Sequence, residues 1–233
     1  MVKRDLTIKE IGESISDLWE SLSEEQRELV AKDFTIQRFK KNEMIYCEGD
    51  MPTHIMCLLS GKVKIFKDGV GGRSQIIRVI KPVEYFAYRA YFANEEFVTA
   101  AAAFEPSVIG MIPMDTITRL ISENNQLAWF FIQQLSIDLG ISDKRTVSLT
   151  QKHIRGRLAE SLLFLKESYG VEEDGFTLSI YLSREDLANL SNMTTSNAIR
   201  TLSNFASEKL IAIDGRKIKL IDEDRLKKIS KIG

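Results

Sequence analysis

Polar side chains recur at helical spacing in one segment near the end of the chain, LSREDLANLSNMTTSNAIRTLSNFASEKLI, which begins at Leu182. On a helix, Thr195, Ser196, Asn197 and Arg200 would lie on a common outer face. Hydroxyl groups bond to phosphate oxygens, and a guanidinium can bond bidentately to the O6 and N7 atoms of guanine. This chemistry indicates recognition of a DNA duplex rather than catalysis.

Capping and turn signals predict the two helices that would position these side chains. Ser183 is an N-cap, with Asp186 three residues later as an acidic capping-box variant. Ser191-Asn192-Met193 forms the turn, where Asn192 accepts a left-handed conformation, and Thr194 caps the second helix. The small or apolar residues of the inner faces are Leu187, Ala188, Leu190, Ala198, Leu202 and Phe205. We predict a helix-turn-helix from about 183 to 205.

A hairpin follows this motif. The stretch LIAIDGRKIKLI holds Asp214-Gly215, a type I′ turn signal, and carries Arg216, Lys217 and Lys219 at its tip. The motif is therefore expected to be winged. The residues expected to contact DNA are Arg184, Thr194, Thr195, Ser196, Asn197, Arg200, Arg216 and Lys217. A winged motif can also serve as a scaffold for binding protein.

Short strands are predicted upstream. Between Phe34 and Ile112 the stretch Lys62 to Lys67 alternates, and Gly49-Asp50, Ser60-Gly61, Asp68-Gly69 and Gly71-Gly72 mark turns. This pattern is typical of a β-sandwich or barrel. Short helices precede it from Ile15 to Phe34, with a break at Ser23.

A long helix followed by another is predicted from Met114 to Tyr169, because apolar residues recur there at helical spacing. The long helix has apolar residues on more than one face, so we expect it to touch its own β-domain and a second copy of the chain. A helix buried wholly within one subunit is the alternative. The residues expected at the dimer helix are Leu127, Phe131, Leu135 and Ile141.

Bulk properties exclude several classes of protein. The 233 residues are 44% hydrophobic and 28% charged, which suits two globular domains, and the net charge of −1 argues against indiscriminate binding of nucleic acid. No apolar run would span a bilayer or form a secretory signal, so we expect a cytoplasmic protein with no membrane partner. Cys47 and Cys57 are expected to be buried thiols.

The whole chain resembles the CRP/FNR family, the catabolite activator protein and its relatives. The resemblance is carried by Glu48-Gly49-Asp50, by the run from Leu59 to Ile65, by QKHIRGRLA from Gln151, and by SREDLA from Ser183. It implies an α+β fold: a cyclic-nucleotide-binding-like β-roll (jelly roll) with N-terminal helices over 1–112, a long dimerisation helix over 113–149 and a winged helix-turn-helix over 150–233.

The chain departs from the family in the cyclic-nucleotide phosphate cassette. In members that bind cyclic AMP the cassette reads approximately Gly-Glu-Leu-Gly, with an Arg-Ser pair some residues later, whereas the stretch here is Ala87-Tyr88-Arg89-Ala90 and the pair falls near Phe97-Val98. We expect an effector other than cyclic AMP, or none. The candidate pocket residues are Glu84, Tyr85, Tyr88, Arg89, Phe97 and Val98. Their aromatic character suggests either a plugged pocket or a site for an apolar or aromatic ligand.

No metal and no cofactor is predicted. Two cysteines cannot build the cysteine-ligated iron-sulfur sensor of the family's other branch. A haem would need an axial ligand, for which His54, His153, Cys47 and Cys57 are candidates only by residue type.

Catalysis is not expected. A cupin enzyme would cluster histidine and carboxylate ligands, which two histidines about a hundred positions apart do not supply. The resemblance implies a homodimeric transcription regulator that binds an inverted-repeat operator, contacts RNA polymerase and responds to an unknown small-molecule effector. The alternative is a ligand-binding regulatory protein that acts on a protein partner without DNA.

Overall fold

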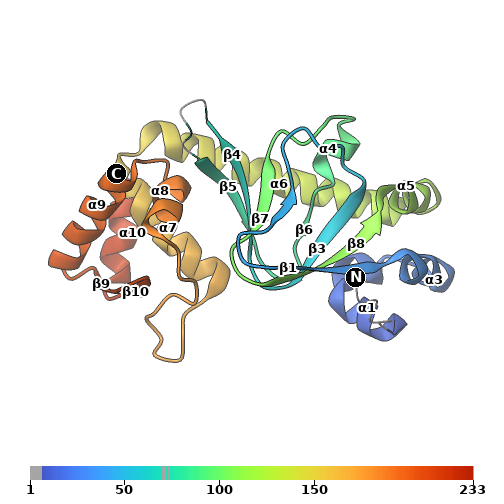
Figure 1. Cartoon of the computed structure of the whole chain (residues 1–233), viewed down its shortest axis with the longest axis horizontal. Helices are drawn as coiled ribbons and strands as arrows, with labels where there is room; N and C mark the ends of the chain where they lie inside the picture. Colours follow the sequence, from blue (N-terminus) through green and yellow to red (C-terminus); the bar gives the residue numbers. More distant parts are fainter. Residues whose placement is uncertain (1–6, 70–71, 73, 233) are drawn as a thin grey trace. The chain divides into compact units, whose positions relative to one another are not determined.

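The computed structural model describes residues 7–69, 72 and 74–232 (Figure 1). The chain divides into two compact units, Met1–Lys67 with Ile77–Leu139 and Asp68–Ile76 with Gly140–Gly233. The division thus passes through the long helix, which the sequence analysis treated as a segment of its own. The two units are described in turn.

A roll of two four-stranded sheets forms the centre of the first unit. The sheet orders are β1-β8-β3-β6 and β2-β7-β4-β5. The strands are β1 (Thr35–Phe39), β2 (Met44–Tyr46), β3 (His54–Ser60), β4 (Val63–Asp68), β5 (Ser74–Ile80), β6 (Tyr85–Phe86), β7 (Ala100–Ala103) and β8 (Ser107–Pro113). The described ladders are antiparallel, with Ile55 opposite Ile112 in the β3–β8 pair. The predicted β-roll is confirmed.

Alternation along β3 gives this unit two apolar clusters. Successive side chains of a strand point to opposite faces, and Leu58 joins Ile65 and Ala101 of the other sheet in the interior of the roll. Ile55 and Cys57 belong to a second cluster, formed with the helices. The sheet β1-β8-β3-β6 is therefore covered on both faces.

The turn between β3 and β4 needs glycine. Gly61 has a φ of +93°, and a Cβ atom there would lie 2.6 Å from the carbonyl oxygen of Pro106. Both the backbone angle and the close approach disfavour a side chain. The predicted Ser60-Gly61 turn is confirmed, whereas Gly71 of the later glycine pair lies outside the described residues.

Three helices precede the roll: α1 (Ile8–Ser14), α2 (Ser16–Glu20) and α3 (Glu24–Asp33). Ser23 separates α2 from α3, as predicted, because its hydroxyl accepts a bond from the Gln26 amide and the Gln26 side chain accepts one from the Ser23 amide. This capping box starts a new helix. A short helix, α4 (Arg89–Phe92), follows β6.

The segment 113–149, expected as one helix, divides at Asn124 into α5 (Met114–Glu123) and α6 (Asn125–Gln151). Asn124 has an extended backbone, and its side-chain oxygen accepts bonds from the amides of Gln126 and Leu127. Its amide nitrogen donates to the Ser21 carbonyl oxygen at 2.7 Å. These bonds stabilise a helix start that hydrophobic periodicity could not reveal.

The apolar residues of α6 point in two directions. Leu127 and Phe131 are buried in the helix-side cluster of the first unit, and Leu135 packs against that cluster. Leu127 and Phe131 lie on the long helix, as predicted, but their side chains are covered within their own chain and do not face a second copy. Ile141 is exposed, as a partner-facing residue would be.

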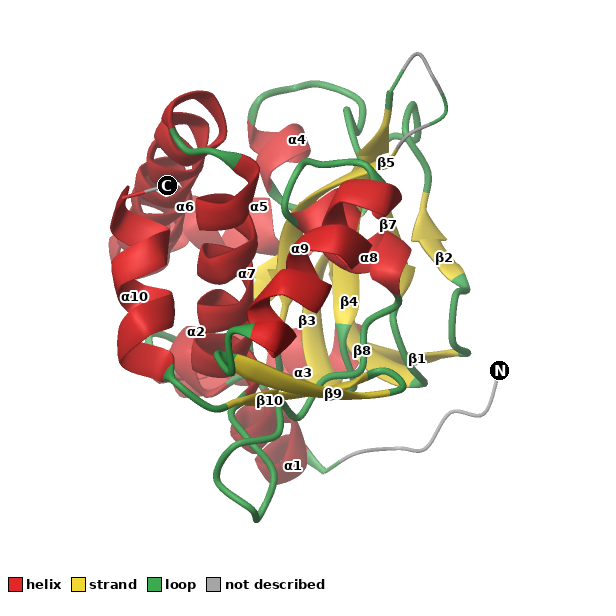
Figure 2. Ribbon diagram, turned by 90° about the vertical axis from the view of Figure 1, so that its left-hand side faces the viewer, coloured by secondary structure: helices red, strands yellow, loops and turns green. Residues whose placement is uncertain are grey.

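Helices and one hairpin make up the second unit, in addition to the outer part of β5 and the end of α6. They are α7 (Ile154–Tyr169), α8 (Arg184–Leu190), α9 (Thr195–Ser207), β9 (Ile211–Asp214), β10 (Lys217–Leu220) and α10 (Glu223–Ile232). Helix α7 contacts α8, α9 and α10, and Figure 2 shows the hairpin below α9 in that view. The winged helix-turn-helix is confirmed, whereas α10 was not predicted.

The turn of the hairpin differs from the expected one. Asp214 pairs with Lys217, so Gly215 and Arg216 are the central residues. Gly215 has a φ of +56°, while Arg216 is not among the described residues with positive φ. A type I′ turn needs positive φ at both positions, so the backbone instead has the type II′ pattern of positive φ at the first central residue alone.

Candidate nucleic-acid interface

The start of α8 is fixed by its cap. The Ser183 hydroxyl accepts a bond from the Asp186 amide (3.0 Å) and donates one to the Asp186 carboxylate (2.7 Å). Leu187, Ala188 and Leu190 are buried on the inner face of the helix. The predicted cap and inner face are confirmed.

The turn between α8 and α9 is held by α7. Asn192 has the expected left-handed conformation, with a φ of +49°. Arg157 Nη2 donates to the Asn192 carbonyl oxygen (3.1 Å), and the Ser191 hydroxyl donates to that of Ser161 (2.9 Å). The sequence analysis assigned no role to Arg157 or Ser161, because both contacts join residues 30 or more positions apart.

Helix α9 presents a polar outer face. Thr194 caps the helix by accepting a bond from the Asn197 amide (3.2 Å), and the inner-face residues Ala198, Leu202 and Phe205 are buried, as predicted. The outer-face residues Thr195, Ser196 and Arg200 are exposed, and Asn197 is partly exposed.

Arg200 is oriented by a neighbour. Its Nη2 donates to Asn197 Oδ1 at 2.8 Å, one helical turn away. The bond reduces the rotamer freedom of the guanidinium before any ligand arrives, which lowers the entropy cost of binding. Ile199 lies between these residues with 48% of its surface exposed. Ile199 was not predicted as an outer-face residue, although the buried positions 198, 202 and 205 already imply that it points outward.

The basic residues of the wing do not share one environment. Arg216 is exposed at the tip and has no ion pair within the described part of the chain. Lys217 Nζ lies 3.9 Å from the Glu172 carboxylate and 5.4 Å from the centre of the Tyr181 ring. Lys219 Nζ lies 3.1 Å from Asp174. These acidic partners were not predicted from the sequence.

An acidic loop supplies the partners of the wing. Asp174 accepts bonds from the Thr177 hydroxyl (2.6 Å) and from the amides of Phe176 and Thr177. These bonds, led by the Thr177 hydroxyl and followed by Lys219, hold the pKa of Asp174 well below its usual range. Thr177 also forms a bridge with Lys219 of β10, so the loop is attached to the hairpin through its backbone.

Arg184, which is expected to contact DNA, also bonds to the wing. Its Nη2 donates to the Gly215 carbonyl oxygen at 2.7 Å, and its Nη1 is buried with no hydrogen-bond partner among the described residues. The guanidinium therefore links the start of α8 to the tip of the hairpin. This contact joins residues 31 positions apart.

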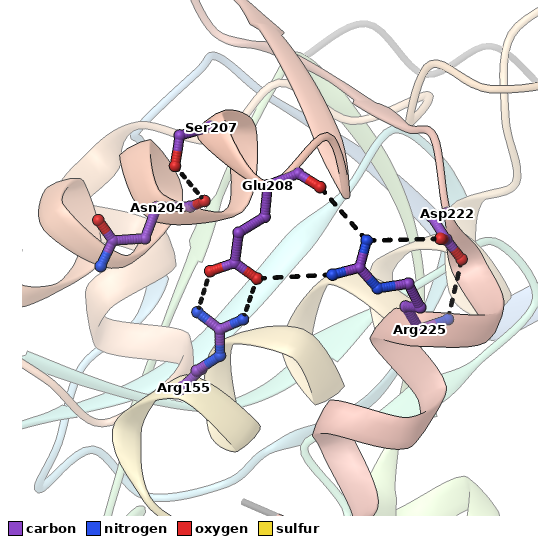
Figure 3. Close-up of polar contacts among 6 residues, drawn as sticks. All are labelled: Arg155, Asn204, Ser207, Glu208, Asp222 and Arg225. Carbon is purple, nitrogen blue, oxygen red and sulfur yellow. Dashed lines mark hydrogen bonds and ion pairs between the residues drawn. The ribbon is translucent and has the colours of Figure 1, made fainter.

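A carboxylate joins the end of α9 to the neighbouring helices (Figure 3). Both Glu208 carboxylate oxygens accept bonds from Arg155 of α7, one at 2.7 Å, and Arg225 of α10 donates to the Glu208 carbonyl oxygen at 3.4 Å. The Arg155 guanidinium also lies 4.8 Å from the Phe205 ring centre. The bonds from Arg155 hold the pKa of Glu208 below its usual range. The network fixes the position of α9 relative to α7 and α10.

The candidate effector residues of the roll do not form one site. Tyr85 and Tyr88 are buried in the cluster on the helix side, whereas Phe97 is buried inside the roll, stacked on Tyr46 at 3.9 Å between ring centres. Val98 is exposed, and Arg89 pairs with Glu95 at 3.1 Å on the surface. The Glu84 carboxylate accepts a bond from the Lys81 amide (3.1 Å), and burial raises its pKa.

Tyr88 takes part in a polar network within the first unit. Its hydroxyl donates to Asp138 Oδ2 (3.3 Å), which also accepts a bond from Arg78 Nη1 (2.5 Å). Burial, followed by the nearby Asp138 charge, raises the pKa of Tyr88 above its usual value. Ala87 has a φ of +70°, a left-handed conformation that glycine, the residue of the cassette at this place, adopts without strain. The altered cassette thus bonds to α6 of its own chain.

The cysteines and histidines lie apart from one another. Cys57 is buried, and burial raises its pKa to about 12, whereas Cys47 is exposed, so the expectation of two buried thiols is wrong for Cys47. His54 lies beside the Thr53 hydroxyl at the start of β3, and His153 precedes α7. Across residues 7–69, 72 and 74–232, no three histidine, cysteine or acidic side chains gather closely enough to hold a metal ion. No helix in the same ranges is long and apolar enough to cross a membrane.

Comparison with known proteins agrees with both units. Residues 36–124 match the family model of the cyclic nucleotide-binding domain, and residues 156–229 match that of the Crp-like helix-turn-helix domain. The CRP-like cAMP-activated global transcriptional regulator of Mycobacterium tuberculosis is 22% identical over 189 residues, 81% of this chain and 84% of that protein. Regulatory protein HlyX of Actinobacillus pleuropneumoniae is 25% identical over 219 residues, 91% and 90% of the two chains.

Solved structures show the same fold. FixK2 from Bradyrhizobium japonicum has a TM-score of 0.77 at 21% identity and covers 84% of this chain and 96% of its own. A CooA mutant from Carboxydothermus hydrogenoformans has a TM-score of 0.73 at 19% identity, covering 97% and 96%. With a nucleotide-binding-type roll, a long helix and a winged helix-turn-helix in this order, the chain belongs to the CRP/FNR family of transcription regulators.

Proposed function

We propose that the chain binds an inverted-repeat DNA operator as a homodimer and reads its sequence with α9. The observation that carries the proposal is the outer face of α9, where exposed hydroxyl groups and the pre-oriented Arg200 guanidinium lie on a helix whose inner face is buried. Such a helix fits the major groove, where its N-terminal residues meet base edges. Arg216 at the tip of the wing is the free cation best suited to contact a phosphate.

Dimerisation would use the exposed apolar side of α6. Its exposed large apolar residues are Trp129, Ile132, Ile137, Leu139, Ile141 and Val147. Two such helices packed about a two-fold axis would bury these side chains, and closed two-fold dimers are the commonest homo-oligomers. The two recognition helices would then reach half-sites about 34 Å apart, one turn of the duplex.

The effector is other than cyclic AMP, or there is none. A cyclic phosphate calls for a guanidinium and a hydroxyl, and the ribose calls for a carboxylate. At the corresponding places the chain has Tyr88, which is buried and bonded to Asp138, and Phe97-Val98. Phe97 stacks on Tyr46 and Tyr88 packs on Phe131, so aromatic side chains of the chain itself contact both residues.

The remaining parts of the proposal follow from the family. The regulator would act in the cytoplasm and contact RNA polymerase at its promoters. The exposed positions of Arg200 and Arg216 support DNA as the partner, because neither guanidinium is paired with a carboxylate in the described structure.

Selection of bound duplexes from a random DNA pool, with and without cyclic AMP, tests this function. We expect a palindromic consensus that appears whether or not the nucleotide is present. A consensus that requires cyclic AMP would contradict the effector assignment. If no duplex is enriched under either condition, either DNA binding requires an effector that the assay lacks or the partner is a protein rather than DNA.

A further inference from the structure

One apolar side chain interrupts the polar outer face of α9. Ile199 has 48% of its surface exposed, whereas the other large apolar residues of this helix, Leu202 and Phe205, are buried. A β-branched residue at an exposed helix position lowers helix propensity relative to alanine and leaves apolar surface in water. The Ile199 side chain therefore adds little to the stability of the fold. This suggests that it contacts a ligand.

The position of Ile199 is that of a base-reading residue. It is the fifth residue of α9 (Thr195–Ser207), adjacent to Arg200 and one turn after Ser196. Residues three and four apart share a helix face, so Ile199 lies over Ser196 and below Ser203. The bond from Arg200 to Asn197 holds the guanidinium on the outer face of the same helix. Because Ile199 and Arg200 are consecutive residues of α9, a base that Arg200 contacts would lie next to a base within reach of Ile199.

The chemistry of the major groove offers one apolar group. Guanine, cytosine and adenine present only donors and acceptors there, while thymine adds its C5-methyl group. An aliphatic side chain against a donor or acceptor would remove water from it without replacing the hydrogen bond. We propose that Ile199 is a specificity-determining residue that packs on a thymine methyl, beside the base that Arg200 contacts. This inference rests on the proposed function and adds a base preference to it.

A protein partner fits the same surface less well. Protein-docking surfaces are contiguous apolar patches of several hundred square ångströms. The neighbours of Ile199 on the outer face, Ser196, Arg200 and Ser203, are exposed and polar. A single aliphatic group surrounded by hydrogen-bonding groups matches one methyl in a polar groove.

Deletion of the thymine methyl provides the test. Duplexes selected with the full chain from a random pool are amplified twice, once with thymidine triphosphate and once with deoxyuridine triphosphate, which preserves base pairing but lacks the methyl group. We expect the unmodified protein to lose about four-fold in affinity for each half-site, the worth of one buried methyl, and about fifteen-fold for both. The variant Ile199→Ala should bind the two duplexes equally.

A matched control uses an isoleucine that is equally exposed elsewhere in the second unit. Ile221 has 50% of its surface exposed and lies after β10. The variant Ile221→Ala should discriminate thymine from uracil as the unmodified protein does. Circular dichroism and thermal melting of both variants check that the fold is retained.

The possible outcomes separate the inference from the proposed function. If the unmodified protein binds both duplexes equally, or if Ile199→Ala still discriminates between them, the role of Ile199 is refuted while DNA binding stands. If no duplex is enriched in the first place, the proposed function itself fails. If Ile199→Ala binds the thymine and uracil duplexes equally, while the unmodified protein and Ile221→Ala prefer thymine, the contact between Ile199 and a thymine methyl is confirmed.

Discussion

The Arg200 guanidinium is exposed, and the Asn197 amide already holds it by a 2.8 Å bond. The variant Arg200→Ala should lower affinity for the selected operator by 1–3 kcal/mol, about 5- to 150-fold, because a base contact is lost. The free energy of unfolding should hardly change, since the Arg200 side chain is exposed. Fluorescence anisotropy with a labelled duplex measures the affinity, and an affinity equal to that of the unmodified protein would refute the base-reading role.

Residues whose environment is local could be predicted from the sequence, and those with distant partners could not. The buried positions of Ala198, Leu202 and Phe205 follow from helical spacing. The pairing of Lys217 with Glu172 and of Arg184 with Gly215 depends on how the chain folds back over 31 or more positions. Periodicity carries no information about such contacts.

The basic side chains of the wing differ in whether an acidic side chain lies beside them. Arg216 is unpaired in the described structure, whereas Lys217 and Lys219 face Glu172 and Asp174. Each lysine or arginine that neutralises a DNA phosphate contributes about 0.9 to the slope of log K against log salt. We expect Arg216→Ala to reduce the slope by about 0.9 per protomer, and Lys219→Ala to change it much less.

Titrations of operator binding at 50 to 300 mM potassium chloride measure this slope. The lysine variant is the control, because it removes the same charge from the same hairpin. Equal reductions in the two variants would show that DNA displaces Asp174 from Lys219, and would contradict the division of the wing into free and neutralised cations.

The Glu208 network makes a pH-dependent prediction. The pKa of Glu208 is lowered, chiefly by its bonds from Arg155. A carboxylate with a lowered pKa in the folded state stabilises that state at neutral pH, and the stabilisation is lost as the pH falls through the folded pKa. We expect Glu208→Gln to reduce the free energy of unfolding by up to about 1 kcal/mol at pH 7, since the group is partly exposed.

Thermal melting of Glu208→Gln and the unmodified protein from pH 7 to pH 3 measures the effect. The difference in Tm should be present at pH 7 and should close below pH 4.5, the ordinary pKa of the group. The exposed loop variant Glu173→Gln is the control, and its Tm should equal that of the unmodified protein at both pH 7 and pH 3. If the Tm of Glu208→Gln is still lower than that of the unmodified protein at pH 3, the loss of stability has a cause other than the charge of Glu208.

Elements could be predicted where their start or end has a local signal. Ser23, Ser183 and Thr194 mark helix starts through side-chain bonds to amides three residues on, and all three are confirmed. The break at Asn124 was missed although its side chain accepts bonds from the amides of Gln126 and Leu127, which is a local signal. A bond to Ser21, 103 residues away, adds a contact that the sequence could not reveal. The turn at Gly215 was predicted with the wrong centre, since the dipeptide Asp-Gly signals a turn without giving its register.

Assembly of the whole molecule depends on which apolar face of α6 packs within the subunit and which face stays exposed. Periodicity showed that the helix is apolar on more than one side, but could not tell which side packs on the chain itself. The structure shows Leu127 and Phe131 buried against the roll, with Phe131 beside Tyr88 at 5.5 Å between ring centres. Six other large apolar side chains of α6 have 51–63% of their surface exposed: Trp129, Ile132, Ile137, Leu139, Ile141 and Val147. An apolar stripe of this extent favours aggregation in water unless a second copy of the chain covers it.

Placing a charge in that stripe tests the proposed assembly. Leu139 is 63% exposed, so Leu139→Glu should leave the fold of one subunit unchanged while burying an unpaired carboxylate in any helix-helix seam. Sedimentation equilibrium should show a dimer for the unmodified protein and a monomer for the variant. Met51→Glu, at 60% exposure on the roll, is the matched control and should remain dimeric.

Loss of the dimer should carry a measurable cost in DNA binding. Two linked recognition helices bind a palindrome with an affinity that exceeds that of one helix by about 10²- to 10⁴-fold, because the second contact is intramolecular. Leu139→Glu should therefore lose this factor on the full operator and bind an isolated half-site as the unmodified protein does. If the variant remains dimeric, and Ile132→Glu does too, the subunits associate through another surface, and the exposed stripe of α6 needs a different partner.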